Sequence, residues 1–260
     1  MIGTRKEIIA DGQTLSYLEH GTSTDTILFL HGWGGSAESF QDMWMAFGDQ
    51  LSNKRLIALD FPGFGESPAP SLVWSVDDYA TCVVKYLDLM HVSVADIVSH
   101  SFGGRVSTVL LAKYGDRFRK SVYIAPAGIR HENVKQQQIQ VIASTLKSVF
   151  SLPVLRWFFP IARKIGYRLI GSRDYVETSG VMKETFKRVI EEDLTPLLPS
   201  ISALVYIFWG RNDTYVPVGD AAYMKSHIQG SQVTIFEDGR HGIHKTHAVQ
   251  ISEQLIPFLR

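Results

Sequence analysis

The stretch "DIVSHSFGGRV", residues 96–106, places two serines on either side of a histidine and continues with a pair of glycines. A serine hydroxyl is presented for attack on a carbonyl carbon at a sharp turn between a strand and a helix, where small neighbours let the two elements approach closely. The pattern of that turn, Gly-x-Ser-x-Gly, fits Ser101 as the nucleophile with Gly103 behind it. Ser99 stands in the front position in place of glycine, and we interpret it as a tolerated small spacer. Alone, the stretch also fits a plain turn between a strand and a helix.

The chain also supplies the two groups that a serine nucleophile requires. A serine hydroxyl is a poor nucleophile unless a histidine takes its proton and an acid orients that histidine. Asp213 lies in the stretch "GRNDTYVP" and His241 in "EDGRHGIHKTH", and each stretch follows an apolar run of strand character. Side chains just past the carboxyl ends of parallel strands meet at one edge of a sheet. We therefore predict that Ser101, His241 and Asp213 meet there as nucleophile, base and acid.

Other residues compete for these roles. Asp238 is a rival acid, but it lies inside the turn that carries His241 and has less freedom to reach the far side of the imidazole. His244 and His247 follow His241 at intervals of three, so the cluster also suggests a metal site. No cysteine or carboxylate lies at matching spacing, and we expect no metal. We place His244 and His247 in the first turn of the last helix.

Two glycine-rich loops also follow predicted strands. The loop "HGWGGS", residues 31–36, lets backbone N–H groups come close to a ligand because glycine has no Cβ to obstruct them. The loop "DFPGFGES", residues 60–67, lacks the third glycine of a dinucleotide fingerprint, and Pro68 follows where a helix should begin. No phosphate-binding loop is present, and we expect no cofactor. We expect His31 and His100 to pack and to hydrogen-bond to loops, with no part in proton transfer.

The composition excludes several classes of partner. The chain has 260 residues, is 45% apolar, and carries 26 basic against 26 acidic residues. These values are typical of a soluble globular protein with one large core or two small ones. A net charge of zero gives no electrostatic signal for nucleic acid or for an anionic membrane. The lone cysteine, Cys82, excludes an intrachain disulfide and fits a reducing compartment, so we expect a cytoplasmic protein. The oligomeric state is left open.

The sequence carries no membrane signal. Residues 1–21 have no apolar segment behind a basic start, so we expect no signal peptide. No uninterrupted apolar run reaches the about 18 residues of a membrane span. The nearest approach is "VFSLPVLRWFFPI", residues 149–161, which two prolines and an arginine interrupt. We interpret it as a buried or pocket-lining helix, with a shallow interfacial face as the alternative, and expect no stable membrane insertion.

Strands and helices alternate in the predicted structure. Residues 6–10 and 15–19 flank an Asp-Gly turn and predict a hairpin. Short, wholly apolar runs predict strands that are buried on both faces of a sheet. These runs are residues 26–30, 55–59, 96–99, 121–125, 204–209 and 232–236. A helix is predicted at residues 76–90, where Ser75 and Asp78 form a capping box. This order predicts the α/β class, with a mostly parallel, doubly wound sheet and helices on both of its faces.

One segment breaks the alternation. Residues 128–200 are helical in pattern and contain no convincing strand, and they are too many for an ordinary crossover. We predict a helical cap there, between a first part of the core at residues 1–127 and a second part at residues 201–260. The cap carries three consecutive aromatic residues, Trp157, Phe158 and Phe159. They either line a hydrophobic pocket or pack the cap onto the core.

The motifs together resemble the α/β-hydrolase superfamily over essentially the whole chain. The stretches that carry the resemblance are "HGWGG", "DFPGFGES", "SHSFGG", "GRNDTYVP" and "GRHGIH". By this resemblance, the backbone N–H groups of Trp33 and Phe102 would form an oxyanion hole. The segment at residues 128–200 would be the variable cap domain of the family, inserted before the strand that carries the acid.

The identity of the nucleophile narrows the expected reaction. The haloalkane dehalogenases and epoxide hydrolases of this superfamily use aspartate at the elbow, whereas Ser101 stands there in this chain. We expect hydrolysis of a small to medium apolar carboxylic ester through an acyl-enzyme intermediate, with a small-molecule ester as the partner. A carbon–carbon bond hydrolase that acts on dienoate-type ketones would use the same triad. Those relatives usually carry tryptophan after the catalytic histidine, and here Gly242 follows. A hydrolase-like receptor with slow turnover is the third alternative.

Overall fold

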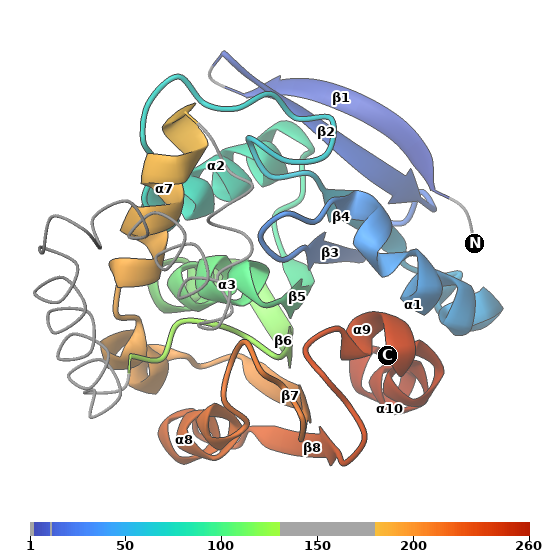
Figure 1. The fold of residues 1–260 in the computed structure, drawn as a ribbon. Helices are drawn as coiled ribbons and strands as arrows, with labels where there is room; N and C mark the ends of the chain where they lie inside the picture. The colour runs from blue at the N-terminus through green and yellow to red at the C-terminus, as the bar shows by residue number, and fades with distance from the viewer. Residues whose placement is uncertain (1–2, 11, 131–179) are drawn as a thin grey trace, which may run out of the picture. The chain divides into compact units, whose positions relative to one another are not determined.

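The computed structural model describes residues 3–10, 12–130 and 180–260. Residues 1–129 and 179–260 form one compact unit. Its centre is a single sheet of eight strands in the order β1-β2-β4-β3-β5-β6-β7-β8. Figure 1 shows the helices on either side of this sheet. The predicted α/β fold with a doubly wound sheet is confirmed.

The strands fall into an antiparallel hairpin and a parallel part. Strands β1 and β2 pair antiparallel, and β2 continues antiparallel onto β4. From β4 to β8, neighbouring strands run parallel. The bounds are β1 Thr4–Ala10, β2 Gln13–His20, β3 Thr26–Leu30, β4 Arg55–Leu59, β5 Ala95–His100, β6 Phe118–Ile124, β7 Leu204–Gly210 and β8 Gln232–Phe236. Each predicted strand is present, and parallel pairing brings the carboxyl ends of β3 to β8 to one edge.

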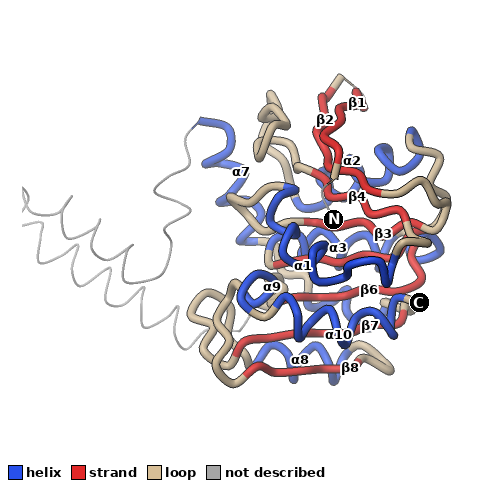
Figure 2. Tube along the Cα trace, turned by 90° about the vertical axis from the view of Figure 1, so that its right-hand side faces the viewer, coloured by secondary structure: helices blue, strands red, loops and turns tan. Residues whose placement is uncertain are grey.

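Helices cover both faces of the sheet. Their bounds are α1 Gln41–Phe47, α2 Val76–Leu89, α3 Phe102–Lys113, α7 Gly180–Glu191, α8 Gly219–His227, α9 Ile243–Thr246 and α10 Ala248–Leu259. Side chains of α1, α9 and α10 pack into one core cluster, and those of α2, α3 and α8 into the other. Figure 2 shows these two groups of helices on opposite sides of the strands. Short 3₁₀ helices lie at Ala37–Phe40, Gly48–Leu51, Gly115–Arg117 and Thr195–Ser200.

Local sequence explains how these elements form. Every residue of β3 and of β5 is buried, including the polar residues Asp96, Ser99 and His100 of β5, as expected for central strands with helices on both faces. Helix α2 begins with the predicted capping box, in which Ser75 and Asp78 hydrogen-bond to each other's backbone N–H. None of the helices in the described ranges is long and apolar enough to cross a membrane.

Two of the described elements lie inside the range that the sequence assigns to the cap. Helix α7 and the 3₁₀ helix at Thr195–Ser200 belong to the same compact unit as the sheet. The Arg105 guanidinium of α3 donates to the backbone oxygens of Val189 (2.7 Å) and Glu192 (3.0 Å). Thr185 of α7 accepts the backbone N–H of Trp74 at 3.2 Å. These bonds fasten α7 to α3 and to the loop before α2.

Helix α3 packs directly against the end of β3. A Cβ added to Gly103 would lie 2.1 Å from the backbone oxygen of Leu30 and 2.9 Å from that of His31. Real Cβ atoms do not approach a backbone oxygen so closely, so the first turn of α3 fits against β3 only with glycine at this position.

Gly103→Ala should therefore destabilise the protein by about 1–3 kcal/mol or more, because the backbone of β3 or α3 must shift to make room. Urea unfolding of the purified variant measures this change. Gly219→Ala is the matched control: Gly219 is the first residue of α8, and an added Cβ there would meet nothing within 4 Å. The control should unfold at the parent's urea concentration or slightly above it. Equal stability of the two variants would contradict the proposed packing constraint.

Candidate active site

Ser101 stands at the turn from β5 to α3 with a strained backbone. Its φ of 51° and ψ of −109° place a non-glycine residue in the positive-φ region, which costs energy and persists only where the surroundings hold it. Its backbone N–H donates to Ile124 O at 3.1 Å, and Gly104 N and Ala127 N both donate to its backbone oxygen. These bonds hold the turn and leave the Ser101 side chain partly exposed.

The two serines of the opening stretch differ in their surroundings. Ser99 is fully buried in β5, and its hydroxyl donates to the backbone oxygen of Val122 on the neighbouring strand at 3.2 Å. The Ser101 hydroxyl faces the ring of His241, with 2.9 Å between Oγ and Nε2. Of the two hydroxyls, that of Ser101 is the one in contact with a histidine.

The other ring nitrogen of His241 contacts the predicted acid. His241 Nδ1 lies 2.7 Å from Asp213 Oδ2, and the Asp213 side chain is fully buried. Asp213 Oδ1 accepts the backbone N–H groups of Tyr215 (2.8 Å) and Val216 (3.0 Å). With Nδ1–H donated to the carboxylate, Nε2 is left to accept the proton of the Ser101 hydroxyl. This arrangement meets the geometric requirement for activating a serine.

Backbone contact between two loops brings the acid and the histidine together. A Cβ added to Gly210, at the end of β7, would lie 2.4 Å from the carbonyl carbon of Gly239. Asn212 N donates to Gly239 O at 2.9 Å, and Asn212 Nδ2 donates to Glu237 O at 2.9 Å. Glycines at both contact points let the loop after β7 lie against the loop after β8.

The rival acid has a different partner. Asp238 Oδ1 lies 3.0 Å from Nε2 of His247, and its side chain is 88% exposed. His244 lies in the short helix α9, and His247 follows it immediately before α10. Within the described ranges, no group of three or more histidine, cysteine, aspartate or glutamate side chains is arranged to hold a metal ion.

The two backbone N–H groups named for an oxyanion hole come from adjacent segments. Phe102 is the first residue of α3, where backbone N–H groups have no acceptor within the helix. Trp33 lies in the loop after β3. Its neighbour Gly32 is close to the turn from β5 to α3, since a Cβ added to Gly32 would be 3.2 Å from Ser101 Cβ. In the part of the chain that the structure describes, neither N–H has a hydrogen-bond acceptor.

The peptide that carries the Trp33 N–H is held by its carbonyl. Gly32 O accepts Gly35 N at 2.9 Å and lies 2.7 Å from His31 Nδ1. His31 Nε2 accepts the backbone N–H of Phe61 at 3.1 Å, so the ring proton is on Nδ1 and donates to Gly32 O. Complete burial lowers the pKa of His31 to about 4, which keeps this imidazole neutral.

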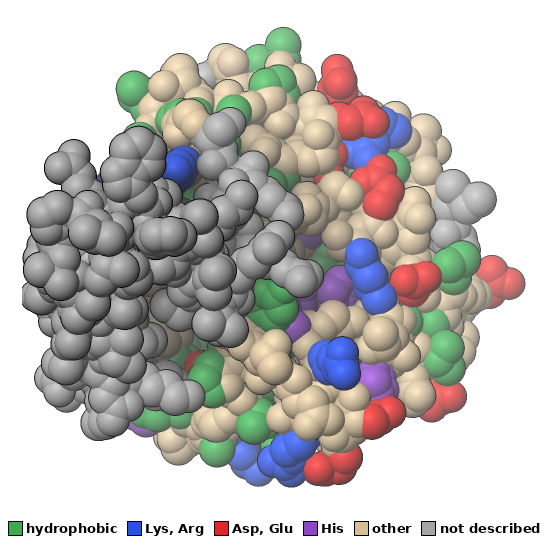
Figure 3. Space-filling model, viewed as in Figure 1, with side chains coloured by type: hydrophobic (Ala, Val, Ile, Leu, Met, Phe, Trp, Pro, Cys, Tyr) green, Lys and Arg blue, Asp and Glu red, His purple; other side chains and the backbone are tan. Residues whose placement is uncertain are grey.

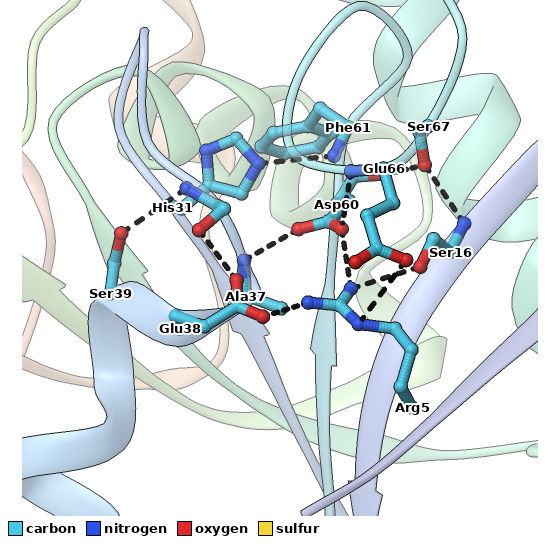
Figure 4. A network of polar contacts seen from close by, with 11 residues as sticks. Arg5, Ser16, His31, Ala37, Glu38, Ser39, Asp60, Phe61, Glu66 and Ser67 are labelled. Carbon is cyan, nitrogen blue, oxygen red and sulfur yellow. Dashed lines mark hydrogen bonds and ion pairs between the residues drawn. The ribbon is translucent and has the colours of Figure 1, made fainter.

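A buried carboxylate ties this loop to two other segments. Asp60, just past β4, is fully buried, and its carboxylate accepts the backbone N–H groups of Ala37 (2.6 Å) and Glu66 (3.0 Å). Arg5 Nη1 of β1 donates to Asp60 Oδ2 at 2.5 Å and to Ser16 Oγ at 2.9 Å. Figure 4 shows Asp60 between the loops that follow β3 and β4, with Arg5 reaching it from β1. The network fixes both loops on the sheet.

Aromatic rings line the side of the site next to Trp33. The ring centroid of Trp33 lies 4.7 Å from that of Phe64, 5.2 Å from that of Phe102 and 5.0 Å from that of Phe186 on α7. On the other side, the half-exposed Tyr215 ring stacks on His241, with 5.0 Å between centroids. Histidine and apolar side chains reach the surface next to one another on the face drawn in Figure 3.

The predicted site residues divide into two groups. The structure brings together Ser101, His241 and Asp213, with Trp33 and Phe102 beside them. The cap aromatics Trp157, Phe158 and Phe159 lie outside the described residues.

Sequence analysis missed Asp60, Tyr215 and Phe186. Asp60 carried a usable signal, since a carboxylate directly after a wholly apolar strand must find buried partners. Phe186 carried no signal, because nothing local separates a pocket aromatic from a packing one.

Comparison with known proteins agrees with this architecture. The profile of the alpha/beta hydrolase family matches residues 27–254, so the chain belongs to that family. The resemblance drawn from the motifs is thereby confirmed. Among solved structures, an esterase from Exiguobacterium antarcticum superposes with a TM-score of 0.75 at 20% identity, over 98% of this chain and 99% of that one. At that identity, the similarity concerns the fold.

Two curated relatives have different activities. The chain is 26% identical to the 2-hydroxy-6-oxononadienedioate/2-hydroxy-6-oxononatrienedioate hydrolase of Escherichia coli, over 95% of this chain and 92% of that protein. It is 25% identical to the dihydrolipoyllysine-residue acetyltransferase component of the acetoin cleaving system of Cupriavidus necator. That match covers 89% of this chain and spans 62% of the relative's length. The relatives therefore share the family and differ in chemistry.

Two further histidines are buried near the site and are held neutral. Burial, with a smaller contribution from the nearby charge of Lys245, lowers the pKa of His244 to about 3. Burial also lowers the pKa of His100 well below the ordinary value, with additional contributions from His244 and His241. Together with His31, they form a set of imidazoles that protonate more readily in the unfolded chain than in the folded one.

The free energy of unfolding should therefore fall as the pH is lowered from about 6.5 toward 4. The reason is that these three histidines bind protons in the unfolded chain and stay neutral in the folded one. Each such group contributes up to about 1.4 kcal/mol per pH unit within its window. Urea unfolding at a series of pH values measures the slope. His244→Leu should show a shallower loss than the parent, and an unchanged slope would contradict a neutral, buried His244.

Proposed function

We propose that the protein is a serine hydrolase that cleaves carboxylic esters through an acyl-enzyme intermediate. The observation that supports it is the line of contacts from Asp213 through His241 to Ser101, with 2.7 Å and 2.9 Å between the bonded atoms. A histidine that donates one ring N–H to a carboxylate and accepts a serine hydroxyl at its other nitrogen is arranged for general-base catalysis.

The residues would act in two half-reactions. Ser101 Oγ attacks the ester carbonyl carbon as its proton passes to His241 Nε2, and the Trp33 and Phe102 N–H groups stabilise the oxyanion that forms. His241 returns the proton to the leaving alcohol, and the acyl group stays on Ser101. Water then attacks the acyl-enzyme with His241 again as base, which releases the acid. Asp213 stays ionised and orients the imidazole throughout.

The surroundings favour an apolar acyl group of small to medium size. The rings of Trp33, Phe64 and Phe186 lie beside the proposed oxyanion donors and are half-buried. Apolar side chains next to a few polar groups are typical of pockets for small molecules. A cytoplasmic location belongs to the same proposal, since one cysteine permits no intrachain disulfide.

Cleavage of a carbon–carbon bond is the second candidate. The Escherichia coli relative, which matches this chain over nearly its whole length, is a hydrolase of a 2-hydroxy-6-oxo dienedioate. Such a substrate is a ketone with two carboxylates, so it differs from an ester in the bond cleaved and in charge. Gly242 after His241, in place of the tryptophan usual in carbon–carbon hydrolases, favours the ester reaction.

Replacement of the nucleophile tests the proposal. Ser101→Ala should reduce kcat/KM for p-nitrophenyl esters by about 1,000-fold or more, since only oxyanion stabilisation and binding remain. Ser99→Ala is the matched control and should keep most of the activity, because the Ser99 hydroxyl is buried against Val122 O. A fluorophosphonate should label the parent and Ser99→Ala on Ser101 and leave Ser101→Ala unlabelled. Labelling of Ser99 would refute the assignment.

The same proteins should be assayed on two sets of substrates. A series of esters with acyl chains of two to twelve carbons should be hydrolysed with repeated turnover, and a 2-hydroxy-6-oxo dienoate should be cleaved slowly or not at all. Faster cleavage of the dienoate would transfer the proposal to the carbon–carbon hydrolase. A single turnover without release would instead indicate a receptor.

The assignment of the acid has a matched pair of variants. Asp213→Asn should lower kcat by about 1,000-fold or more with little change in KM, because the amide no longer fixes the tautomer of His241. Asp238→Asn should leave ester hydrolysis nearly unchanged, since that exposed carboxylate pairs with His247. Steady-state kinetics of both variants at neutral pH gives the comparison. The opposite ranking would assign the acid to Asp238.

A further inference from the structure

His100 directly precedes Ser101 and reaches the loop that carries His241. Its side chain is buried, and Nε2 lies 3.0 Å from the backbone oxygen of His241. A carbonyl oxygen can only accept, so the hydrogen is on Nε2 and His100 is the donor. In the described ranges, His241 O has no other donor.

His100 and Ser101, which are adjacent at the turn from β5 to α3, therefore contact His241 at two points. Ser101 Oγ contacts the His241 ring at Nε2, and His100 Nε2 contacts the His241 backbone. These two hydrogen bonds therefore link the side chain and the backbone of His241 to two residues that are adjacent in the chain. A displacement of this turn would move the Ser101 hydroxyl and the His241 imidazole together.

The His100 ring has little freedom to move. It packs against the tilted ring of His244, with 3.9 Å between centroids and 38° between planes, and lies 4.8 Å from the centroid of His241. On another side Gly32 is so near that an added Cβ would be 2.8 Å from His100 Nδ1. A side chain confined in this way loses little further entropy when it donates a hydrogen bond.

The charge of the donor also matters to its neighbour. Because burial lowers the pKa of His100 well below the ordinary value, the ring is neutral at neutral pH. A lysine or arginine that donated to His241 O would place a positive charge beside the imidazole and disfavour its protonation. A neutral imidazole can hold the loop without placing a charge beside the proposed general base.

The geometry points to His100 as a positioning residue, which holds the backbone of His241 so that its Nε2 faces the hydroxyl of Ser101. This role rests on the proposed function, in which His241 is the general base. His100 itself exchanges no proton with substrate. It keeps the base at hydrogen-bond distance from the nucleophile before the substrate binds, as preorganisation requires.

A pair of substitutions separates donation from packing. His100→Leu removes the donor, and His100→Gln keeps an amide N–H at about the reach of Nε2. His100→Leu should lower kcat for p-nitrophenyl esters by about 100-fold with little change in KM, the effect of a displaced catalytic group. His100→Gln should stay within about tenfold of the parent, since the donated bond is kept. His247→Leu, which removes another buried histidine, between α9 and α10, should keep the parent's kcat.

An NMR readout keeps the test independent of turnover. The Nδ1 proton of His241, bonded to Asp213, should give a downfield resonance in the parent, in His100→Gln and in His247→Leu, and should broaden or shift in His100→Leu. Parental kcat and an unchanged resonance in His100→Leu would overturn the role of His100. So would equal losses in the Leu and Gln variants with equal melting temperatures. If the parent neither hydrolysed esters nor reacted with a fluorophosphonate, the proposed function would be wrong. The resonance of the His241 Nδ1 proton would still decide whether His100 positions His241.

Discussion

The direct packing of α3 on β3 is the constraint on which the candidate site depends. Gly103 places the helix backbone against the last carbonyl of β3, and no side chain fits between them. The turn before the helix is then so tight that Ser101 takes a positive φ, and its hydroxyl points away from the sheet. The same contact brings the loop after β3, with Trp33, beside the first N–H of α3. One backbone contact thus places both the proposed nucleophile and the proposed oxyanion donors.

The candidate site combines polar groups at strand ends with apolar rings from loops and from α7. The polar groups lie at strand ends, where backbone and buried side chains such as Asp60 and His31 fix them. The apolar rings near them come from the loops after β3 and β4 and from α7, which is bonded to α3 through Arg105. Apolar side chains on such elements can change without disturbing the contacts from Asp213 through His241 to Ser101.

Most of the fold could be predicted from the sequence because buried parallel strands are wholly apolar. Strand β8 has the predicted bounds, and β3 and β4 do too. Strand β6 begins three residues earlier than predicted, at Phe118, because Arg119 and Lys120 lack the apolar character of a buried strand. Arg119 is accommodated there by bonds to Asp96 on β5. A partner on another strand cannot be recognised from a local pattern.

The candidate site was predictable to the same extent. Ser101, Asp213 and His241 were found because each follows an apolar strand, which is a local signal. The contact from His100 to His241 joins residues 141 positions apart, and only the packing of the loops creates it. The glycines at these contact points can be read from the sequence. The backbone segments that they approach cannot. Sequence thus predicts the reacting groups better than the groups that hold them.

The charge of Asp60 gives the edge strand β1 an unexpected importance. An outermost strand is ordinarily the part of a sheet that is lost or exchanged most easily, since it pairs on one side. Here Arg5 of that strand is the counter-ion of a fully buried carboxylate. If β1 peeled away, Asp60 would be left as an unpaired charge in the interior, which is strongly destabilising. Fraying at the margin of the sheet would thus reach the loop after β4, which carries Asp60, and the segment after β3 that Asp60 holds through the backbone N–H of Ala37.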